Sequence, residues 1–370
     1  MTGGAGFIGA HVARRLLADG HALRVLDVLH PQIHGDSGRP GYLPSEVELL
    51  TGDLRDPAVV RRALEGVTAV VHLAARVGVG QSMTDMVEYS STNVMGTATL
   101  LSELADSTVE RLVVASSMSV YGEGAYAAPD GRLVSPPARD IRTVTDFGWD
   151  PLDARGLVLT AVPTPETQPA APTSMYAVDK LHQEQACLIF GRSRGIPVTG
   201  LRLFNVYGPF QALSNPYTGV IVNLAVRILN GQRPIVFEDG NQRRDFVHVD
   251  DVARAFALAL ARGGPDVEPD CFNIGSGHSA TVAEVASLLA DLLQAGDLTP
   301  DVTHEYRSGD IRHCFADVTR AEQNLGFTAE MTLADGLAKL IAWLRENSSA
   351  PDRMASMHAA LVDRGLVRRR

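Results

Sequence analysis

The chain has 370 residues, 45% of them hydrophobic and 21% charged, and a net charge of −10. That length allows one two-lobed unit or two domains with a large core. The acidic balance argues against nucleic acid and anionic membranes as partners, and no apolar run of about 18 residues predicts a membrane span. Three scattered cysteines form no C-x-x-C pair, so we expect buried, reduced thiols and a cytoplasmic protein.

The chain begins with a glycine-rich loop that leads into a helix. Glycines stand at positions 3, 6 and 9, and residues 7–18 have a helical pattern. Such glycines permit sharp turns and let a pyrophosphate approach the backbone, while the helix N-terminus offers free N–H groups. We therefore expect a dinucleotide to bind here. Loops of this kind follow a buried strand, but only Met1 precedes Thr2. Either the first strand has been lost or the true start lies upstream of this Met; we favour a truncated start and expect a weakened sheet.

An acidic residue closes the next predicted strand, residues 21–27. Asp27 falls 18 residues beyond Gly9, close to the spacing of a carboxylate that accepts the adenosine ribose hydroxyls. Because a carboxylate would repel a 2′-phosphate, this spacing favours NAD over NADP. The alternative is an aspartate that only caps a helix or a turn.

Strands and helices continue to alternate along the first half of the chain. We predict strands at 47–50, 69–73, 111–116 and 197–204 and helices at 57–65, 83–105 and 174–193. This alternation is typical of an α/β fold with a Rossmann-like, doubly wound parallel sheet. Residues 122–172 contain eight prolines and no periodicity, and we interpret them as a lid or a substrate-side insertion.

The second half of the chain has a pattern that predicts a smaller, mixed α/β domain. We predict helices at 219–230, 249–261, 282–293 and 338–346 and a strand at 235–238. We accordingly expect an NAD-binding domain of residues 1–201, to which 243–262 return, and a substrate-binding domain of 202–242 and 263–346. Residues 347–370 end in three arginines and are expected to be a solvated, mobile tail.

A tyrosine and a lysine stand four residues apart in the predicted helix 174–193. Tyr176 and Lys180 would share one helix face, about 5–6 Å apart. An ammonium beside a phenol favours the phenolate and lowers the phenol pKa. Next to a dinucleotide, this pair would combine proton transfer with a hydride acceptor.

Five motifs in order resemble the extended short-chain dehydrogenase/reductase family of NAD-dependent sugar-nucleotide epimerases and dehydratases, across residues 2 to about 346. They are the glycine loop, Leu73-Ala74-Ala75, the Ser116–Gly122 segment, the Tyr176/Lys180 pair, and Leu203–Pro209. This resemblance implies bound NAD and a homodimer that pairs helices 83–105 and 174–193. The implied cofactor contacts are Gly3, Gly6, Phe7, Ile8, Gly9, Asp27, Asp53, Leu54, Leu73, Ala74, Ala75, Tyr176 and Lys180.

The resemblance also implies a reaction at the sugar C4. Tyr176 would take the 4-hydroxyl proton while hydride passes to NAD, Lys180 would hold the nicotinamide ribose, and Ser117 would bond the same sugar oxygen. Ser119 is a second possible donor, although the serines could serve only turns and caps. Asn205, Arg244 and Arg307 would bind the diphosphate of a nucleotide sugar, with surface ion pairs as the alternative for the arginines.

Two positions in the serine motif separate the subclasses of this family. Dehydrating relatives carry Asp-Glu where this chain has Met118 and Ser119, and decarboxylating relatives carry Glu at the second position, so simple oxidation and reduction at C4 remains. A narrower resemblance to dTDP-L-rhamnose 4-epimerases, which form dTDP-6-deoxy-L-talose, involves residues 163–167, 211–220 and 238–240. Those relatives carry cysteines after a tryptophan in the insertion, whereas residues 149–156 here have none, so no metal site is predicted.

The sequence leaves three other functions open. The same residues would serve a net sugar-nucleotide dehydrogenase or 4-ketoreductase, or an epimerase acting on a UDP-hexose. A more remote alternative is a catalytically idle NAD-binding protein, against which the intact Ser117, Tyr176 and Lys180 set argues.

Overall fold

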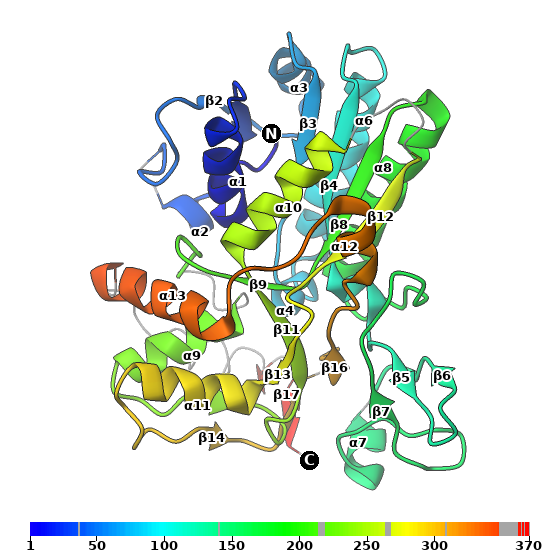
Figure 1. The fold of residues 1–370 in the computed structure, drawn as a ribbon, viewed down its shortest axis with the longest axis vertical. Coiled ribbons are helices and arrows are strands. Elements are labelled where there is room, and N and C mark those ends of the chain that lie inside the picture. The colour runs from blue at the N-terminus through cyan, green and yellow to red at the C-terminus, as the bar shows by residue number, and fades with distance from the viewer. Residues whose placement is uncertain are drawn as a thin grey trace.

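Four parallel strands form a large sheet in the computed structural model, which describes residues 1–35, 38–139, 141–213, 219–262, 268–307, 309–347, 362–363, 365 and 367–369. In spatial order they are β12 (Asp270–Ile274), β8 (Val198–Leu203), β4 (Arg111–Ser117) and β3 (Ala69–His72). Nearly all residues of β4 and β8 are buried, as expected for strands that helices cover on both faces. The fold is the predicted α/β fold of Rossmann type, with a second lobe below it in Figure 1.

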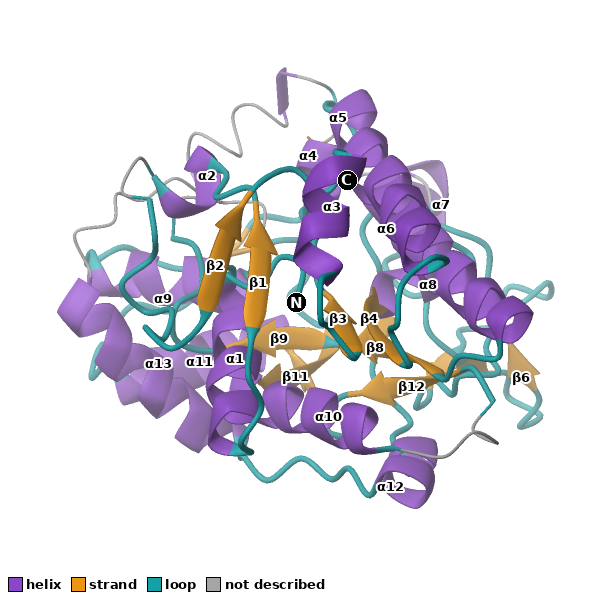
Figure 2. Ribbon diagram, turned by 90° about the horizontal axis from the view of Figure 1, so that it is seen from above, coloured by secondary structure: helices purple, strands orange, loops and turns teal. Residues whose placement is uncertain are grey.

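Helices cover both faces of this sheet (Figure 2). On one face lie α1 (Phe7–Ala18), α10 (Val249–Ala261) and α12 (Thr319–Leu325), which share one hydrophobic core with β4, β8 and β12. On the other lie α3 (Pro57–Leu64), α6 (Gly96–Leu104) and α8 (Met175–Arg194). Both β12 and α12 lie within residues 263–346, which we expected in the substrate-binding domain. More of the chain after residue 262 therefore packs with the large sheet than predicted.

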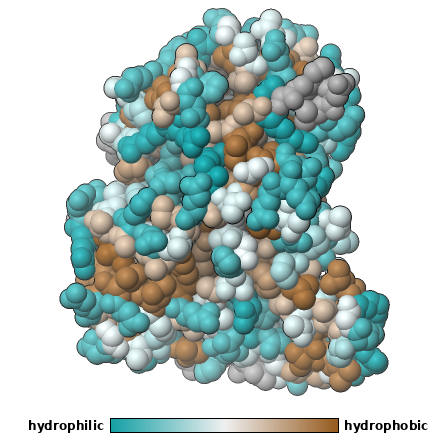
Figure 3. Space-filling view, in the orientation of Figure 1, coloured by the Kyte–Doolittle hydropathy of each residue, from teal (hydrophilic) through white to brown (hydrophobic). Residues whose placement is uncertain are grey.

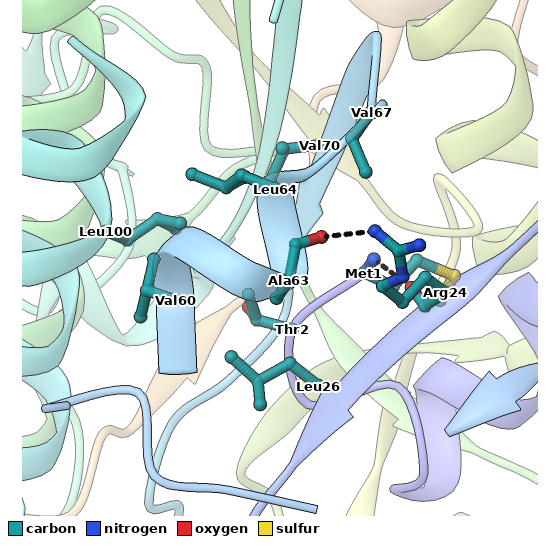
Figure 4. A pocket seen from close by; sticks show the side chains of 10 residues that line it. All are labelled: Met1, Thr2, Arg24, Leu26, Val60, Ala63, Leu64, Val67, Val70 and Leu100. Carbon is teal, nitrogen blue, oxygen red and sulfur yellow. Dashed lines mark hydrogen bonds between the residues drawn. The ribbon is translucent and has the colours of Figure 1, made fainter. Parts of the chain in front are cut away.

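Two further parallel strands, β1 (Arg24–Asp27) and β2 (Glu48–Thr51), continue the sheet beyond a gap. Thr2 alone bridges this gap, pairing with Leu26 on one side and His72 on the other. Thr2 N donates to Val71 O at 3.0 Å and Gly3 N to Leu26 O at 2.8 Å. Beside Thr2 lies a small cavity (Figure 4), lined by Met1, Thr2, Arg24, Leu26, Val60, Ala63, Leu64, Val67, Val70 and Leu100.

The long helix expected at residues 83–105 is interrupted. A short α4 (Val79–Ser82) precedes α5 (Met86–Ser90), which passes through a π-helical turn, η1 (Ser91–Met95), into α6. Within this turn Asn93 is fully buried, and its carbonyl accepts a hydrogen bond from Thr97 Oγ1 at 2.6 Å. The π turn therefore directs two polar side chains into the protein, which a uniform helical pattern does not predict. A further short helix, α2 (Pro31–His34), follows β1.

The insertion at residues 122–172, whose sequence has no periodicity, contains several regular elements. Strands β6 (Leu133–Val134), β5 (Tyr126–Ala127) and β7 (Thr160–Ala161) form an antiparallel sheet beside α7 (Ile141–Phe147). The buried Arg139 lies 3.1 Å from Glu123 and 2.9 Å from Glu238 of the second lobe. Strands of two residues are too short to show an alternating pattern.

The second lobe contains a mixed sheet and three packed helices. Strand β11 (Arg243–His248) pairs with β9 (Asn205–Tyr207), β13 (Ser279–Thr281) and β16 (His313–Cys314). Helices α9 (Val220–Leu229), α11 (Val282–Leu292) and α13 (Leu333–Asn347) share a second core, over which Figure 3 shows an apolar area at the lower left. Two short pairs complete the lobe: β10 (Ile235–Val236) with β14 (Asp301–Val302), and β15 (Glu305–Arg307) with β17 (Val367–Arg369).

The chain end differs from the solvated tail that its arginines suggested. Val367 is buried, and β17 runs antiparallel to β15, so that Val367 stands opposite Arg307. Residues 348–361 lie outside the described residues. Across the described ranges, no helix is both long and apolar enough to cross a membrane.

Candidate active site

The glycine loop at the start of α1 forms a cradle of bare backbone. Gly3 has φ of 66°, and a Cβ there would lie 2.6 Å from Ala74 N at the end of β3. A Cβ on Gly9 would lie 2.6 Å from Gly4 Cα, so only glycine fits at both positions. Gly6 precedes α1 and provides no side-chain cap, so the first N–H groups of the helix are open to an anion.

Two aspartates flank this loop at the carboxyl ends of β1 and β2. Asp27 is buried and accepts from Ala5 N at 3.0 Å and Leu29 N at 2.9 Å, the turn-stabilising role that the sequence left open. Asp53 is engaged by Arg55 through a hydrogen bond of 2.6 Å, which lowers the pKa of its carboxyl. The structure thus brings Asp27 against the cradle, and its oxygens keep lone pairs for a further donor.

Two serines meet where β4 ends and η2 (Met118–Tyr121) begins. Ser117 Oγ accepts from Ser119 N at 3.2 Å and from Ser119 Oγ at 2.9 Å, which leaves its own hydroxyl hydrogen to donate. This hydrogen bonds the Tyr176 phenol and lowers its pKa, but burial raises that pKa more strongly, so the net shift is upward. Ser117 therefore connects Ser119 and Tyr176.

Lys180 does not act on Tyr176 as the spacing suggested. Its Nζ donates to Gln183 Oε1 at 2.8 Å, one turn further along α8, and the Tyr176 pKa is raised rather than lowered. Burial lowers the pKa of the Lys180 ammonium to about 8. The prediction that the ammonium lowers the phenol pKa is therefore wrong for this arrangement, because the ammonium is held by the amide instead.

In the second lobe, two arginines converge on one carboxylate. Arg307 donates to Asp310 Oδ2 at 2.7 Å, and Arg244 approaches Oδ1 at 3.8 Å while donating to Arg312 O at 3.0 Å. Asn205 Oδ1 is buried and has no hydrogen-bond partner among the described residues, the condition of a group that awaits a ligand. Residues 214–218 of the 211–220 motif lie outside the described residues.

The sequence analysis missed several buried polar residues that support this site. Gln183 holds Lys180, Asp310 holds the two arginines, and Glu184 forms an ion pair with Arg202 at 2.7 Å. Gln183 and Glu184 could have been noticed as polar residues that follow Lys180 on the inner face of α8. His72 is buried between Thr2 and Thr97, consistent with a structural role. Among the described residues, no group of three His, Cys, Asp or Glu side chains could hold a metal ion.

Comparison with known proteins gives one consistent family. Residues 1–142 and 158–275 match the NAD dependent epimerase/dehydratase family. The chain is 36% identical to the dTDP-L-rhamnose 4-epimerase of Burkholderia thailandensis over 354 residues, which cover 94% of each chain. It is 30% identical to the solved UDP-glucose 4-epimerase of Thermotoga maritima in complex with UDP-glucose, with a TM-score of 0.76 over 94% of this chain and 98% of that one.

A third relative connects the fold with its cofactor. The solved UDP-glucose 4-epimerase of Thermus thermophilus, in complex with NAD, is 30% identical and has a TM-score of 0.73 over 93% of this chain and 97% of that one. Family, fold and the glycine cradle agree. The chain belongs to the NAD dependent epimerase/dehydratase family and is an NAD-dependent enzyme.

Proposed function

We propose that this protein is an NAD-dependent 4-epimerase of a nucleotide sugar, with dTDP-L-rhamnose and dTDP-6-deoxy-L-talose as its substrate pair. The contact of Ser117 with both Ser119 and Tyr176 at the end of β4 carries this proposal. Met118 and Ser119 supply no carboxylate for dehydration or decarboxylation, which leaves redox chemistry at C4. The 36% identity to a dTDP-L-rhamnose 4-epimerase supports the choice of sugar.

The cradle fits the family's cofactor. The pyrophosphate would lie against Gly3, Gly6 and Gly9 at the open N-terminus of α1, in the space that a Cβ would fill. The remaining proposed contacts are Phe7, Ile8, Asp27, Asp53, Leu54, Leu73, Ala74, Ala75, Tyr176 and Lys180. Bound NAD would supply a hydride acceptor and donor.

The side chains would divide the chemistry at C4. Tyr176, as phenolate, would take the proton of the 4-hydroxyl as the hydride leaves C4, and would return it when the hydride re-adds to the other face of the 4-keto sugar. The Ser117 hydroxyl, already directed at Tyr176, would donate to the same sugar oxygen. Lys180 would hold the nicotinamide ribose.

The second lobe would hold the nucleotide diphosphate. Arg244 and Arg307 lie together around Asp310, and each can present a planar fork to phosphate oxygens. The buried, unpaired Asn205 Oδ1 lies on β9, which continues the chain from the large sheet. We accordingly propose residues 1–201 and 243–262 as the core of the NAD-binding domain and the second lobe as the substrate-binding domain.

We also propose a homodimer formed through the outer faces of α5, η1 and α8. Val87 is 85% exposed and Met95 58%, and they stand eight residues apart along one helical run. Val178 and Ile189 are exposed eleven residues apart on α8, close to three full turns, so they share a face. Apolar side chains exposed at helical spacing on neighbouring helices are typical of helix-to-helix interfaces. A reducing, cytoplasmic location is supported by three buried, unpaired cysteines.

The first experiment is to incubate the purified protein with dTDP-L-rhamnose, without added NAD, and to follow the sugar by NMR. We expect an equilibrium mixture with the 4-epimer, which requires both the reaction and retained cofactor. Conversion of only a UDP-hexose would overturn the sugar, and conversion only with stoichiometric NAD would favour a net dehydrogenase. Tyr176→Phe should lose turnover while it keeps NAD, and unchanged activity would contradict the assignment of the base.

A further inference from the structure

A buried hydrogen-bond network surrounds Gln183 on the inner side of α8. Its Oε1 accepts from Lys180 Nζ at 2.8 Å, and its Nε2 donates to Thr97 Oγ1 at 2.8 Å and to Ala74 O at 3.2 Å. Gln183 is fully buried, and Lys180 is nearly so. An amide in this position has no solvent to exchange partners with, so its orientation is set by its neighbours.

The backbone fixes the direction of the hydrogen bond between Gln183 and Thr97. Thr97 Oγ1 has one hydrogen, and it goes to Asn93 O, which can only accept. Thr97 Oγ1 must therefore accept from Gln183 Nε2. His72 Nε2 lies 3.0 Å from Thr97 Oγ1 and 3.2 Å from Gln183 Nε2, and the ring tautomer determines which of these two groups it bonds.

The other nitrogen of this histidine completes the chain of bonds. Burial holds the His72 pKa at about 3, so the ring is neutral, and its Nδ1 shares a hydrogen bond of 2.7 Å with Thr2 Oγ1. Thr2 Oγ1 in turn accepts from Ala74 N at 3.3 Å. The network thus connects the base of the dinucleotide cradle to Lys180.

The alternative orientation of the amide is excluded by the same bonds. Exchanging Oε1 and Nε2 of Gln183 would place its oxygen against the carbonyl of Ala74 and its NH₂ against the Lys180 ammonium. The first contact would place two acceptors together, and the second would place two donors together. The carbonyl oxygen of Gln183 is therefore held toward Lys180 by donors and acceptors that cannot reverse.

We propose that Gln183 is a positioning residue for catalysis, whose locked carbonyl oxygen fixes the Lys180 ammonium and stabilises its charged form. The titratable groups that interact with that ammonium are Asp179, Glu184 and Cys187 on α8 and His72 on β3. Asp179 is bonded to Ser90 and Glu184 to Arg202, so neither carboxylate is free to turn to Lys180. One ammonium hydrogen is used by Gln183, which leaves two for the ribose that the proposed function assigns to it.

The chain offers an unusually direct test because it contains two lysines, Lys180 and Lys339. Protein labelled with [¹³C]lysine should give two Cε signals, and Lys339→Arg identifies which belongs to Lys180. We would follow the Lys180 signal against pH in the wild type, Gln183→Met and Gln183→Glu. The Lys339 signal, which comes from an exposed side chain on α13, serves as an internal reference.

We expect opposite shifts in the two variants. Gln183→Met removes the acceptor at similar length and should lower the Lys180 midpoint by about one pH unit, the size of one charge-assisted hydrogen bond. Gln183→Glu places a carboxylate there and should raise it by about one unit or more. Thr97→Val removes a partner of the amide but keeps the acceptor, so it should move the midpoint much less.

Equal midpoints in the wild type and Gln183→Met, or no upward shift in Gln183→Glu, would overturn the proposal. A variant that only loosens the fold would not separate the midpoints in opposite directions. In turnover assays, the high-pH limb of kcat should follow the same order. The turnover assay rests on the proposed function, whereas the NMR titration does not. Failure of the proposed function is therefore distinguishable from failure of the proposed role of Gln183.

Discussion

Glu184 and Arg202 form a buried, two-pronged ion pair between α8 and β8. Arg202 Nη2 lies 2.7 Å from Glu184 Oε1 and its Nε 2.8 Å from Oε2, and Ser116 Oγ also donates to Oε2 at 2.6 Å. Because Ser116 precedes Ser117 on β4, this pair joins the helix that carries Tyr176 to the strand end that carries the serines. It fixes the two halves of the candidate site relative to each other.

Arg202→Met should be strongly destabilising. The change leaves the Glu184 charge buried without its partner, which costs about 3–5 kcal/mol. Urea unfolding measures this loss. The double variant Glu184→Gln with Arg202→Met removes both charges and should unfold at higher urea than the single variant. A double variant that is less stable than Arg202→Met would show that packing, rather than the unpaired charge, sets the cost.

Gly9→Ala should abolish cofactor retention. Its Cβ would lie 2.6 Å from the backbone of Gly4, so the cradle must distort at the point where the pyrophosphate is expected. We expect at least a ~100-fold weaker affinity for NAD, measured by calorimetry, on the scale of a displaced phosphate cradle. Gly41→Ala is the control, because nothing lies within 4 Å of a Cβ at that position and its φ is not positive. Similar NAD affinity in both variants would contradict the assignment of the loop.

Lys180→Met should stabilise the protein at neutral pH. Burial lowers the Lys180 pKa from its ordinary value to about 8. Between pH 8 and about 10.4 the unfolded chain therefore keeps a proton on this lysine that the folded protein has lost. The free energy of unfolding rises with pH across that window. Below pH 8 the full cost of burying the ammonium applies, about 3 kcal/mol on this shift. The stability difference between Lys180→Met and the wild type should therefore be largest at pH 7 and shrink toward pH 10. A difference that does not depend on pH would contradict the lowered pKa.

Arg244→Met should weaken substrate binding without loss of cofactor. Arg244 lies on β11 beside Asp310 and Arg307, away from the glycine cradle. We expect KM for the nucleotide sugar to rise about 100-fold, the worth of a charge-assisted contact to phosphate, with NAD content unchanged. Arg243→Met is a matched neighbour, exposed on the same strand and bonded to Ser279. Equal KM values in the two variants would remove Arg244 from the proposed diphosphate site.

The sequence was informative where short motifs coincide with regular elements. The helix predicted at residues 7–18 and that at 249–261 have the bounds of α1 and α10, since each combines an apolar face with a clear start. The doubly wound sheet follows from buried runs such as residues 111–116, which form β4 apart from one further residue, Ser117. The family resemblance pointed to Ser117 beside Tyr176, and the structure places the two in contact at the end of β4.

What could not be predicted depends on contacts between distant residues. The two-residue strands of the insertion are held by the ion pairs of Arg139 with Glu123 and Glu238, which are 16 and 99 residues away. The partner of Lys180 was missed because Tyr176 and Gln183 both stand about one helical turn from it, and only the hydrogen bonds of Gln183 to Ala74 O and Thr97 Oγ1 turn its Oε1 toward Lys180. Likewise, β17 exists only through its pairing with β15.

The single-residue bridge at Thr2 has a consequence for how this lobe comes apart. Between β1 and β3 the backbone is joined by a few bonds at Met1, Thr2 and Gly3, whereas β3, β4, β8 and β12 are paired along their lengths. Local opening should therefore detach residues 1–51 before the four-stranded sheet, and hydrogen exchange would detect it as one fast-exchanging unit. A dinucleotide lying across Gly3 and Ala74 would contact both parts. The NAD-bound protein should therefore undergo this local opening less often than the cofactor-free protein.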